Sequence, residues 1–292
     1  MLSRREFLRK GALGVAAVTA GSSLPRLLRA NPYGLPVGLQ LYTLRDQLQK
    51  NMTGTIKDVA AIGIKEVELY DLYGKTAKQF RKLLDDNGLT APSGHYMAKQ
   101  ITDNWEKHIE DAKALGMKYM VNAILEPDER RNFDDYKRLV ELFNKAGEQT
   151  KKAGIQYCYH NHNFEFKKYG NTTAYDYLLK ALDPKLVNFE MDCFWVTHAG
   201  RDPVKYFHEH PGRFPLLHIK DLSQGFPPTT IKDDTKPGIF SPVGHGTIDW
   251  KRIFEAAPTG GMKHYYIEQD FCTRPPLEAV KMSYEYLHNL KV

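Results

Sequence analysis

Short apolar runs alternate with longer amphipathic stretches from residue 37 to the end of the chain. The short runs have the length and composition of β-strands, and the stretches between them have helical length. This alternation predicts a parallel sheet wrapped by helices, and eight such units close a (β/α)8 TIM barrel. The predicted strands are Val37–Tyr42, Glu66–Tyr70, Ala91–Tyr96, Lys118–Ala123, Ile155–His160, Val187–Asp192, Pro215–Lys220 and His264–Gln269.

Polar and apolar side chains alternate within these strands. In Val187–Asp192 the apolar residues share one parity and the polar residues the other, so the two sets lie on opposite faces. Because the apolar face meets the surrounding helices, the polar face should line the lumen. Burying so many ionisable groups is costly unless they are paired or bound to a metal. The side chains predicted to point inward are Asn188, Glu190, Asp192, His218, Lys220, Glu268, His160 and His162.

Length and charge fit one barrel that acts on a small molecule. The chain has 292 residues, of which 42% are hydrophobic, and a barrel of this kind needs about 250. The net charge is +6, but residues 1–30 contribute about +5 and residues 31–292 only about +1. A nearly neutral body has no electrostatic footprint for a phosphate backbone, so no nucleic-acid partner is expected. Homo-oligomer formation is left open.

Residues 1–30 have the pattern of a twin-arginine signal peptide. Arg4 and Arg5 precede Phe7 and Leu8, and a weakly apolar stretch follows at Gly11–Ala20. We therefore predict export by the twin-arginine route to the periplasm, and a single barrel domain over residues 31–292. The apolar stretch is shorter than the about 20 residues of a membrane span, so no stable membrane insertion is expected after processing.

Chemistry in such barrels is carried by residues at the C-terminal ends of the strands. Imidazole and carboxylate groups converge there from the last four predicted strands. No Cys-x-x-Cys spacing occurs, which argues against a thiolate site. Mixed nitrogen and oxygen donors suit Mn²⁺, Co²⁺, Fe²⁺ or Zn²⁺; Mg²⁺ is kept as a further candidate and Mn²⁺ is preferred. The strand-end residues are Gln40, Glu68, His95, Asn122, His160, His162, Asp192, His218, Lys220 and Glu268.

Five stretches resemble the sugar phosphate isomerase/epimerase family of xylose isomerase-like barrels, which also includes endonuclease IV-type proteins. The likeness spans roughly residues 35–290, and it implies one divalent metal held by residues of the last four strands. Position by position, it implies His160, Asp192, His218 and Glu268 as the ligands. The stretches are Tyr159–Phe166, Glu190–Val196, Leu217–Asp221, Gly244–Asp249 and Ile267–Asp270.

The sequence departs from the family at one ligand. Family members typically have a glutamate followed by Asn-His where this chain has His160, and they use two metal-bound glutamates as acid and base. Only Glu268 is retained. We therefore expect Glu268 and His160 to be the catalytic pair, because imidazole titrates near neutral pH. Glu165, five residues further on, is an alternative that would reach back into the site.

These residues predict proton abstraction next to a carbonyl, with the metal stabilising the resulting enediolate. The leading hypothesis is a metal-dependent isomerase or epimerase of a sugar or keto-sugar. The loss of one glutamate gives weight to an alternative, a lyase that acts on 3-keto-glycosides by β-elimination. A hypothesis from a different class is a non-catalytic periplasmic sugar-binding barrel.

Five further residues are predicted to contact the substrate. Alternatives are weighed for two of them: Trp195 can simply pack in the core, and Lys220 can form a salt bridge to Asp221 or Glu190. The predicted substrate-binding residues are Glu68, His95, His162, Lys220 and Trp195.

Overall fold

The structure, a computed structural model, describes residues 32–231 and 238–292. The segment for which a signal peptide is predicted lies outside these residues. Within the described ranges, no helix is both long enough and apolar enough to cross a membrane.

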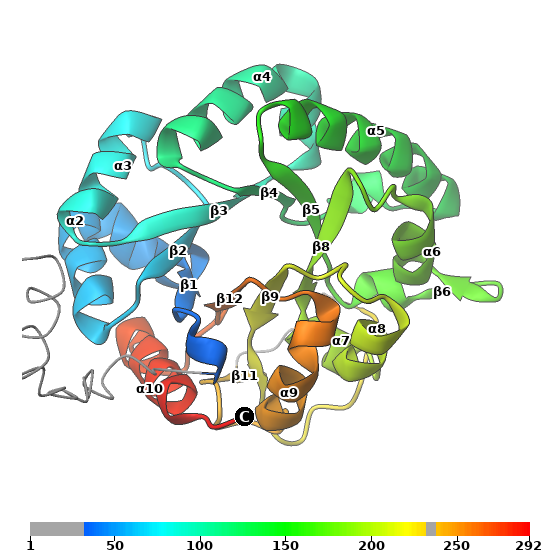
Figure 1. The fold of residues 1–292 in the computed structure, drawn as a ribbon. Helices are drawn as coiled ribbons and strands as arrows, with labels where there is room; N and C mark the ends of the chain where they lie inside the picture. The colour runs from blue at the N-terminus through cyan, green and yellow to red at the C-terminus, as the bar shows by residue number, and fades with distance from the viewer. Residues whose placement is uncertain (1–31, 232–237) are drawn as a thin grey trace, which may run out of the picture.

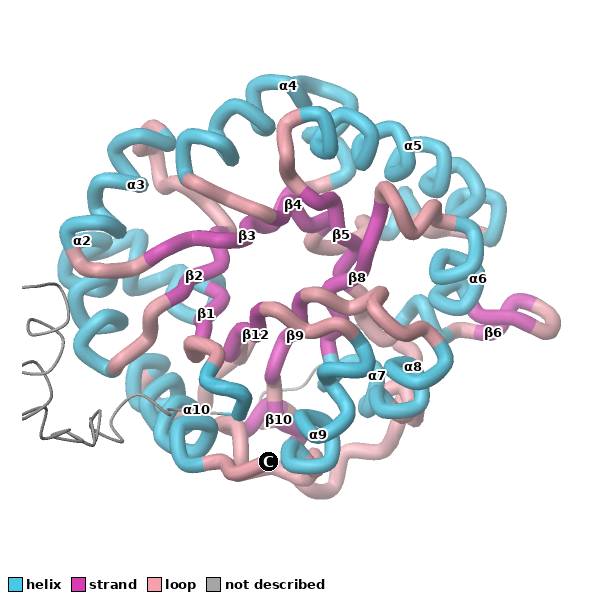
Figure 2. The backbone as a smooth tube through the Cα atoms, viewed as in Figure 1, coloured by secondary structure: helices cyan, strands magenta, loops and turns pink. Residues whose placement is uncertain are grey.

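The strands close into a barrel in the order β1-β12-β9-β8-β5-β4-β3-β2, and the helices form a ring around it (Figure 1). Figure 2 shows the same arrangement as an inner wall of strands and an outer wall of helices. The predicted (β/α)8 fold is confirmed, and each predicted strand is found. Their bounds are β1 Gly38–Gln40, β2 Glu66–Leu69, β3 Thr90–Tyr96, β4 Tyr119–Asn122, β5 Gln156–His160, β8 Val187–Asp192, β9 Leu216–Ile219 and β12 His264–Ile267.

Helices follow most barrel strands, as the alternation predicts. Short 3-10 helices lie at Pro32–Gly34, Leu41–Leu44, Pro127–Glu129 and Phe164–Phe166. The α-helices are α2 Arg45–Ile62, α3 Ala77–Asp86, α4 Ala98–Leu115, α5 Phe133–Lys152, α6 Ala174–Ala181, α7 Cys193–His198, α8 Pro203–Glu209, α9 Trp250–Gly260 and α10 Pro276–Asn289.

Local sequence explains where several helices begin and end. Asp202 accepts a hydrogen bond from the backbone N–H of Val204 and so caps α8 ahead of its first-turn proline. Gly63 ends α2 with a φ of 113°, in the left-handed region that glycine adopts readily. Helix α4 contains a non-helical residue at Asn104. The helix is therefore kinked at this residue.

Two small antiparallel pairs lie outside the barrel sheet. Strands β6 (Lys168–Tyr169) and β7 (Thr172–Thr173) form one, and β10 (Asp221–Leu222) and β11 (Phe240–Ser241) form the other. Neither pair was predicted, because two residues are too few for a hydrophobic period to be detected.

An apolar layer fills the part of the lumen nearer the N-terminal ends of the strands. Val121, Cys158, Leu216 and Tyr266 form this fully buried cluster. Gly38 is needed beside it, since a Cβ at this position would come within 2.5 Å of the Tyr266 ring. The last three cluster members lie two positions before His160, His218 and Glu268, so the polar layer sits directly above an apolar floor.

A buried carboxylate after β9 holds the loop that leads into α9. Asp221 accepts hydrogen bonds from four backbone N–H groups, at 2.8–3.2 Å, and from the Trp250 indole at 2.9 Å. Gly246 is required there, because a Cβ would overlap the Asp221 carboxylate. The motif Gly-His-Gly-Thr-Ile-Asp is therefore held as one unit against the barrel rim.

Replacement of Asp221 by Ala is expected to lower the free energy of unfolding by about 3 kcal/mol, because five donors, two of them in fully buried hydrogen bonds, lose their acceptor. Equilibrium urea unfolding measures the change. Asp58→Asn on the exposed face of α2 is the matched control. A loss no greater for Asp221→Ala than for this control would show that the carboxylate does not hold the segment.

Candidate metal centre and active site

Three potential ligands meet at the C-terminal ends of β8, β9 and β12. Asp192, His218 and Glu268 are buried, and their donor atoms all lie within 4.8 Å of one another. Nδ1 of His218 is 2.8 Å from Oε2 of Glu268 and 4.0 Å from Oδ2 of Asp192. The other Asp192 oxygen accepts a hydrogen bond from the Trp195 backbone N–H and so caps α7. Only Oδ2 of Asp192 is thus directed to the shared point.

The fourth predicted ligand, His160, borders this group. Its Nε2 is 3.7 Å from Oδ2 of Asp192, while Nδ1 of the same ring is 2.9 Å from Oε2 of Glu190. His160 also belongs to a second cluster of potential ligands, together with His95, Glu190 and His218. Its imidazole therefore connects the cluster of Asp192, His218 and Glu268 (the metal-type group) to a polar layer that lies deeper in the lumen.

Two glutamates form the base of that deeper layer. Glu68 Oε2 is 2.6 Å from Nε2 of His218, and Glu190 Oε2 is 2.8 Å from Nε2 of His95. Glu68 also accepts hydrogen bonds from Gln40, at 2.8 Å, and from Ser93. Carboxylates that bind the second nitrogen of a ligand histidine fix its orientation. Glu68, predicted to contact substrate, instead lies below the site and holds His218 from beneath.

The surroundings move the pKa values of His95 and His160 in opposite directions. Burial alone lowers the pKa of His95, but the Glu68 and Glu190 carboxylates outweigh it and raise that pKa to about 9. Burial also lowers the pKa of His160, and the neighbouring His218 and other cations lower it well below its ordinary value. Near neutral pH, His95 is therefore an imidazolium and His160 a neutral imidazole.

The same burial affects the carboxylates. It raises the pKa of Glu190 to about 7, with the Glu68 charge adding to the effect. For Glu268, the positive charges of Lys220 and His218 outweigh burial and lower its pKa. Glu268 is therefore ionised at neutral pH, as a metal ligand must be.

A cavity of about 270 Å³ opens over the group. Five residues predicted from the sequence line it, and four other predicted site residues do not. Two of these, Asp192 and His218, belong to the group over which the cavity opens. Trp195 is fully buried in an apolar cluster with Phe194 and Phe240, and Glu68 lies in the layer below. The lining residues are Tyr42, Tyr70, His95, Met97, Ala123, Ile124, Glu126, His160, His162, Lys220, Glu268 and Asp270.

Glu165 does not reach back into the site. Its carboxylate accepts hydrogen bonds from the Tyr159 hydroxyl, at 2.6 Å, and from the backbone N–H of His162, at 2.9 Å. The short helix Phe164–Phe166 turns the chain so that Glu165 is buried behind β5. This alternative for the catalytic base was wrong, because both oxygens of the Glu165 carboxylate are engaged by these hydrogen bonds and do not face the lumen.

Lys220 has partners other than those weighed from the sequence. Its Nζ is 2.6 Å from Glu268 Oε2, 3.0 Å from Asp192 Oδ2 and 3.0 Å from Asp270 Oδ1. The alternative of a salt bridge was right in kind, but Asp221 and Glu190 were the wrong partners: Asp221 faces the loop outside the lumen, and Glu190 lies one layer deeper.

The donor set fits a divalent cation. One imidazole nitrogen and two ionisable oxygens converge, and His160 Nε2 is close by. Asp192 Oδ2 is buried and lies 3.0 Å from the Lys220 ammonium, so this oxygen is already paired with a positive charge, as a buried carboxylate oxygen requires. Nitrogen and oxygen donors without sulfur are typical of first-row divalent metals. Asp192, His218 and Glu268 are the residues that would hold one, and His160 lies beside them.

Comparison with known proteins identifies the family. Residues 56–290 match the family described as xylose isomerase-like TIM barrel. The chain belongs to this family. A crystal structure described as a sugar phosphate isomerase/epimerase from Parabacteroides distasonis is 31% identical, with a TM-score of 0.72, over 87% of this chain and 93% of the other.

Two further similar proteins bear on the function. The inosose dehydratase of Lacticaseibacillus casei is 27% identical over 261 residues, which cover 80% of this chain and 87% of that protein. The IOLI protein, whose crystal structure contains a bound zinc atom, has a TM-score of 0.69 at 13% identity, over 86% of this chain and 96% of the other. At that identity the likeness shows the fold alone.

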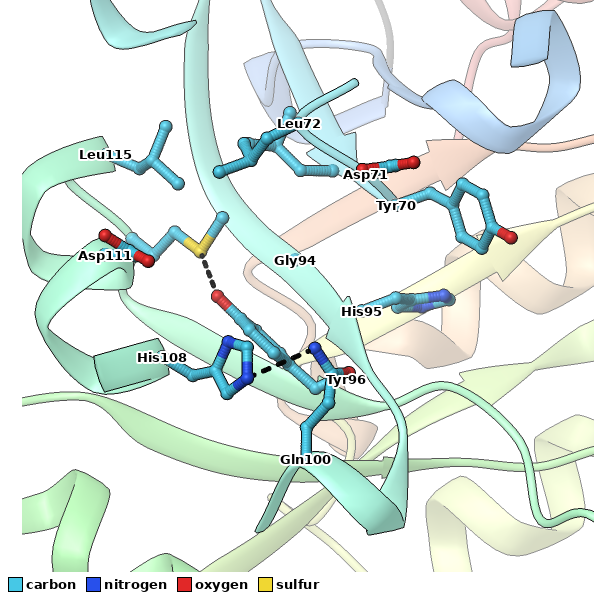
Figure 3. A pocket seen from close by; sticks show the side chains of 12 residues that line it. Tyr70, Asp71, Leu72, Gly94, His95, Tyr96, Gln100, His108, Asp111 and Leu115 are labelled. Atoms are coloured by element: carbon cyan, nitrogen blue, oxygen red, sulfur yellow. Dashed lines mark hydrogen bonds between the residues drawn. The ribbon is translucent and has the colours of Figure 1, made fainter. Parts of the chain in front are cut away.

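A second cavity, of about 220 Å³, lies behind β3 and against α4 (Figure 3). Tyr96 faces it and donates a hydrogen bond to Met117 Sδ at 3.4 Å, while Gln100 and His108 are 3.5 Å apart. Among the described residues that line this cavity, only His95 belongs to a cluster of potential metal ligands. The chemistry therefore belongs to the cavity at the barrel mouth.

The buried Glu165 carboxyl should make the stability of the folded chain depend on pH. Burial raises its pKa from 4.5 to about 7, so between these values the folded chain binds more protons than the unfolded chain, and stability falls as pH rises. Glu165→Gln removes this loss. Its stability relative to the natural chain should therefore increase by up to about 3 kcal/mol between about pH 5 and about pH 8.

Urea unfolding at the two pH values measures this difference. Glu148→Gln, on the exposed face of α5, is the control and should show no comparable change. A stability difference for Glu165→Gln that is the same at both pH values would contradict the assignment.

Proposed function

We propose that this chain is a metal-dependent lyase that removes a β-hydroxyl or β-alkoxyl group from a keto-sugar or keto-cyclitol. One observation carries the proposal: His160 and His95 line the same cavity beside the metal-type group, with ring centroids 5.2 Å apart, and their surroundings move their pKa values in opposite directions. Two titratable groups whose environments drive their pKa values apart are suited to act as base and acid.

β-Elimination needs both of these groups. A bound divalent metal, with Mn²⁺ as our first choice, would polarise the carbonyl and stabilise the enediolate. His160 takes the proton from the carbon next to the carbonyl, and the released electron pair forms the new double bond. The bond to the β-oxygen breaks, and His95 gives its proton to that oxygen. Water or an alcohol leaves, and the two histidines have exchanged their protonation states.

The size of the cavity supports a small polar substrate. Its volume of about 270 Å³ is below the roughly 300–1,000 Å³ typical of sites for drug-sized ligands. Tyr42 and Tyr70 form an aromatic corner of the cavity, with ring centroids 4.8 Å apart. Polar groups on the floor and aromatic rings on the wall suit a single sugar or cyclitol ring.

The relatives support this reaction class. The curated homologues at 27% identity are named inosose dehydratase, and dehydration is the elimination of water. The solved neighbour at 31% identity is described as a sugar phosphate isomerase/epimerase, which supports isomerisation or epimerisation as the second candidate. Both candidates begin with the same proton abstraction, but only elimination changes the mass of the substrate.

Two histidine variants separate the base from the acid. With Mn²⁺ and inosose in D₂O, His160→Gln should lose both deuterium incorporation and elimination, with kcat lowered by about 10²-fold to 10⁴-fold. His95→Gln should still incorporate deuterium but lose elimination by a similar factor. Mass spectrometry follows deuterium uptake and the loss of water in one experiment.

His208→Gln, exposed on α8, is the matched control. Deuterium uptake without loss of mass in the natural chain would favour the isomerase or epimerase. Sugar binding with neither change would favour a non-catalytic sugar-binding barrel. If His95→Gln eliminated at the natural rate, the acid would have to be another group.

We also propose that the chain is exported to the periplasm by the twin-arginine route. Arg4-Arg5 followed by Phe7-Leu8 supports this. Residues 1–30 fused to a reporter protein should direct it to the periplasm, and Arg4→Lys/Arg5→Lys should abolish transport. Transport by the Arg-to-Lys fusion would contradict the proposed route.

A further inference from the structure

The Lys220 ammonium lies at the metal-type group itself. The side chain is only 2% exposed, and its Nζ touches the carboxylates of Glu268, Asp192 and Asp270 at 2.6–3.0 Å. A buried ammonium among three carboxylates neutralises part of their charge, which is required in a low-dielectric lumen.

The ammonium and a divalent metal would use the same two oxygen atoms. Lys220 contacts Oε2 of Glu268 and Oδ2 of Asp192, and these are the oxygens that face Nδ1 of His218. A metal ion binds carboxylate oxygens at about 2.0–2.2 Å. An ammonium that kept both contacts would lie a few ångströms from the metal, where two positive charges repel strongly.

The third carboxylate offers the ammonium another position. Asp270 belongs to neither cluster of potential metal ligands, and its side chain is 15% exposed at the edge of the cavity. The Trp195 ring, whose centroid is 5.7 Å from Nζ, faces the ammonium as well. A cation is stabilised by a carboxylate and by an aromatic face, so Lys220 has two partners that are not potential metal ligands.

We propose that Lys220 is the counter-ion of the metal-free site and competes with the metal. It holds Asp192 and Glu268 together before metal binds, releases them when metal enters, and stays paired with Asp270. The competition sets the metal affinity, and it keeps the two ligand carboxylates ordered without metal. This inference rests on the metal site of the proposed function, but not on the reaction that the site carries out.

Two variants should shift the affinity in opposite directions. Lys220→Met removes the competitor, so Mn²⁺ should bind at least about tenfold more tightly, and the metal-free chain should melt at a lower temperature. Asp270→Asn removes the carboxylate with which Lys220 stays paired when metal enters, so Mn²⁺ should bind at least about tenfold more weakly. Titration of the metal-free full chain with Mn²⁺ alone measures both affinities, and thermal unfolding supplies the second readout.

Lys251→Met, which removes an exposed ion pair on α9, is the control and should leave Mn²⁺ affinity unchanged. Equal or weaker Mn²⁺ binding by Lys220→Met would overturn the proposal. If that variant does not fold, Asp270→Asn decides alone, because an affinity equal to that of the natural chain would also overturn it. If neither the natural chain nor Lys220→Met binds Mn²⁺, both the proposed competition and the proposed metal site are wrong. If the chain binds Mn²⁺ as predicted but has no lyase activity, only the proposed reaction is wrong.

Discussion

The mutual neutralisation of charges inside the barrel is the constraint on which the rest of the structure depends. Glu68, Glu190, Asp192 and Glu268 are almost completely buried, and each lies within 4.0 Å of a histidine or lysine nitrogen. A lone buried carboxylate would be far too costly. The closed sheet brings these pairs together from strands that are distant in sequence, so the fold and the site stabilise one another.

The charge of the candidate metal group matches that of a divalent cation. Two carboxylates, Asp192 and Glu268, face the metal position, so one divalent cation neutralises them. In the metal-free state, the Lys220 ammonium supplies part of the same charge. The neutral imidazole left beside the group can accept a proton, which a metal-bound carboxylate does less readily.

Much of the fold and part of the site could be predicted from sequence. The alternation of strand and helix gave the barrel, and the parity of Asn188, Glu190 and Asp192 gave the side of the strand that faces inward. These predictions succeed because a period of two residues is local information. The same parity brought His95, His160, His162, Lys220 and Glu268 to the cavity wall.

The predictions that were wrong concern how deep a side chain lies in the lumen, how a loop turns, and which residues a side chain contacts. Strand parity says that Glu68 points inward but not how deep it lies, so its place below the cavity could not be predicted. The position of Glu165 depends on the turn after β5, and the partners of Lys220 depend on Asp270, which follows the last strand. Glu190 was predicted to face the lumen, but its contact with His95 required the register of two strands that are not neighbours in sequence.

The central claim is that one divalent metal is held at the common point of Asp192, His218 and Glu268. Anomalous diffraction at the manganese edge, from crystals of the chain grown with Mn²⁺, tests it most directly. The account predicts one strong peak within about 2.0–2.3 Å of donor atoms of all three residues, with His160 next to it. A peak among His95, Glu190 and the other ring nitrogens instead, or no peak inside the barrel, would contradict it.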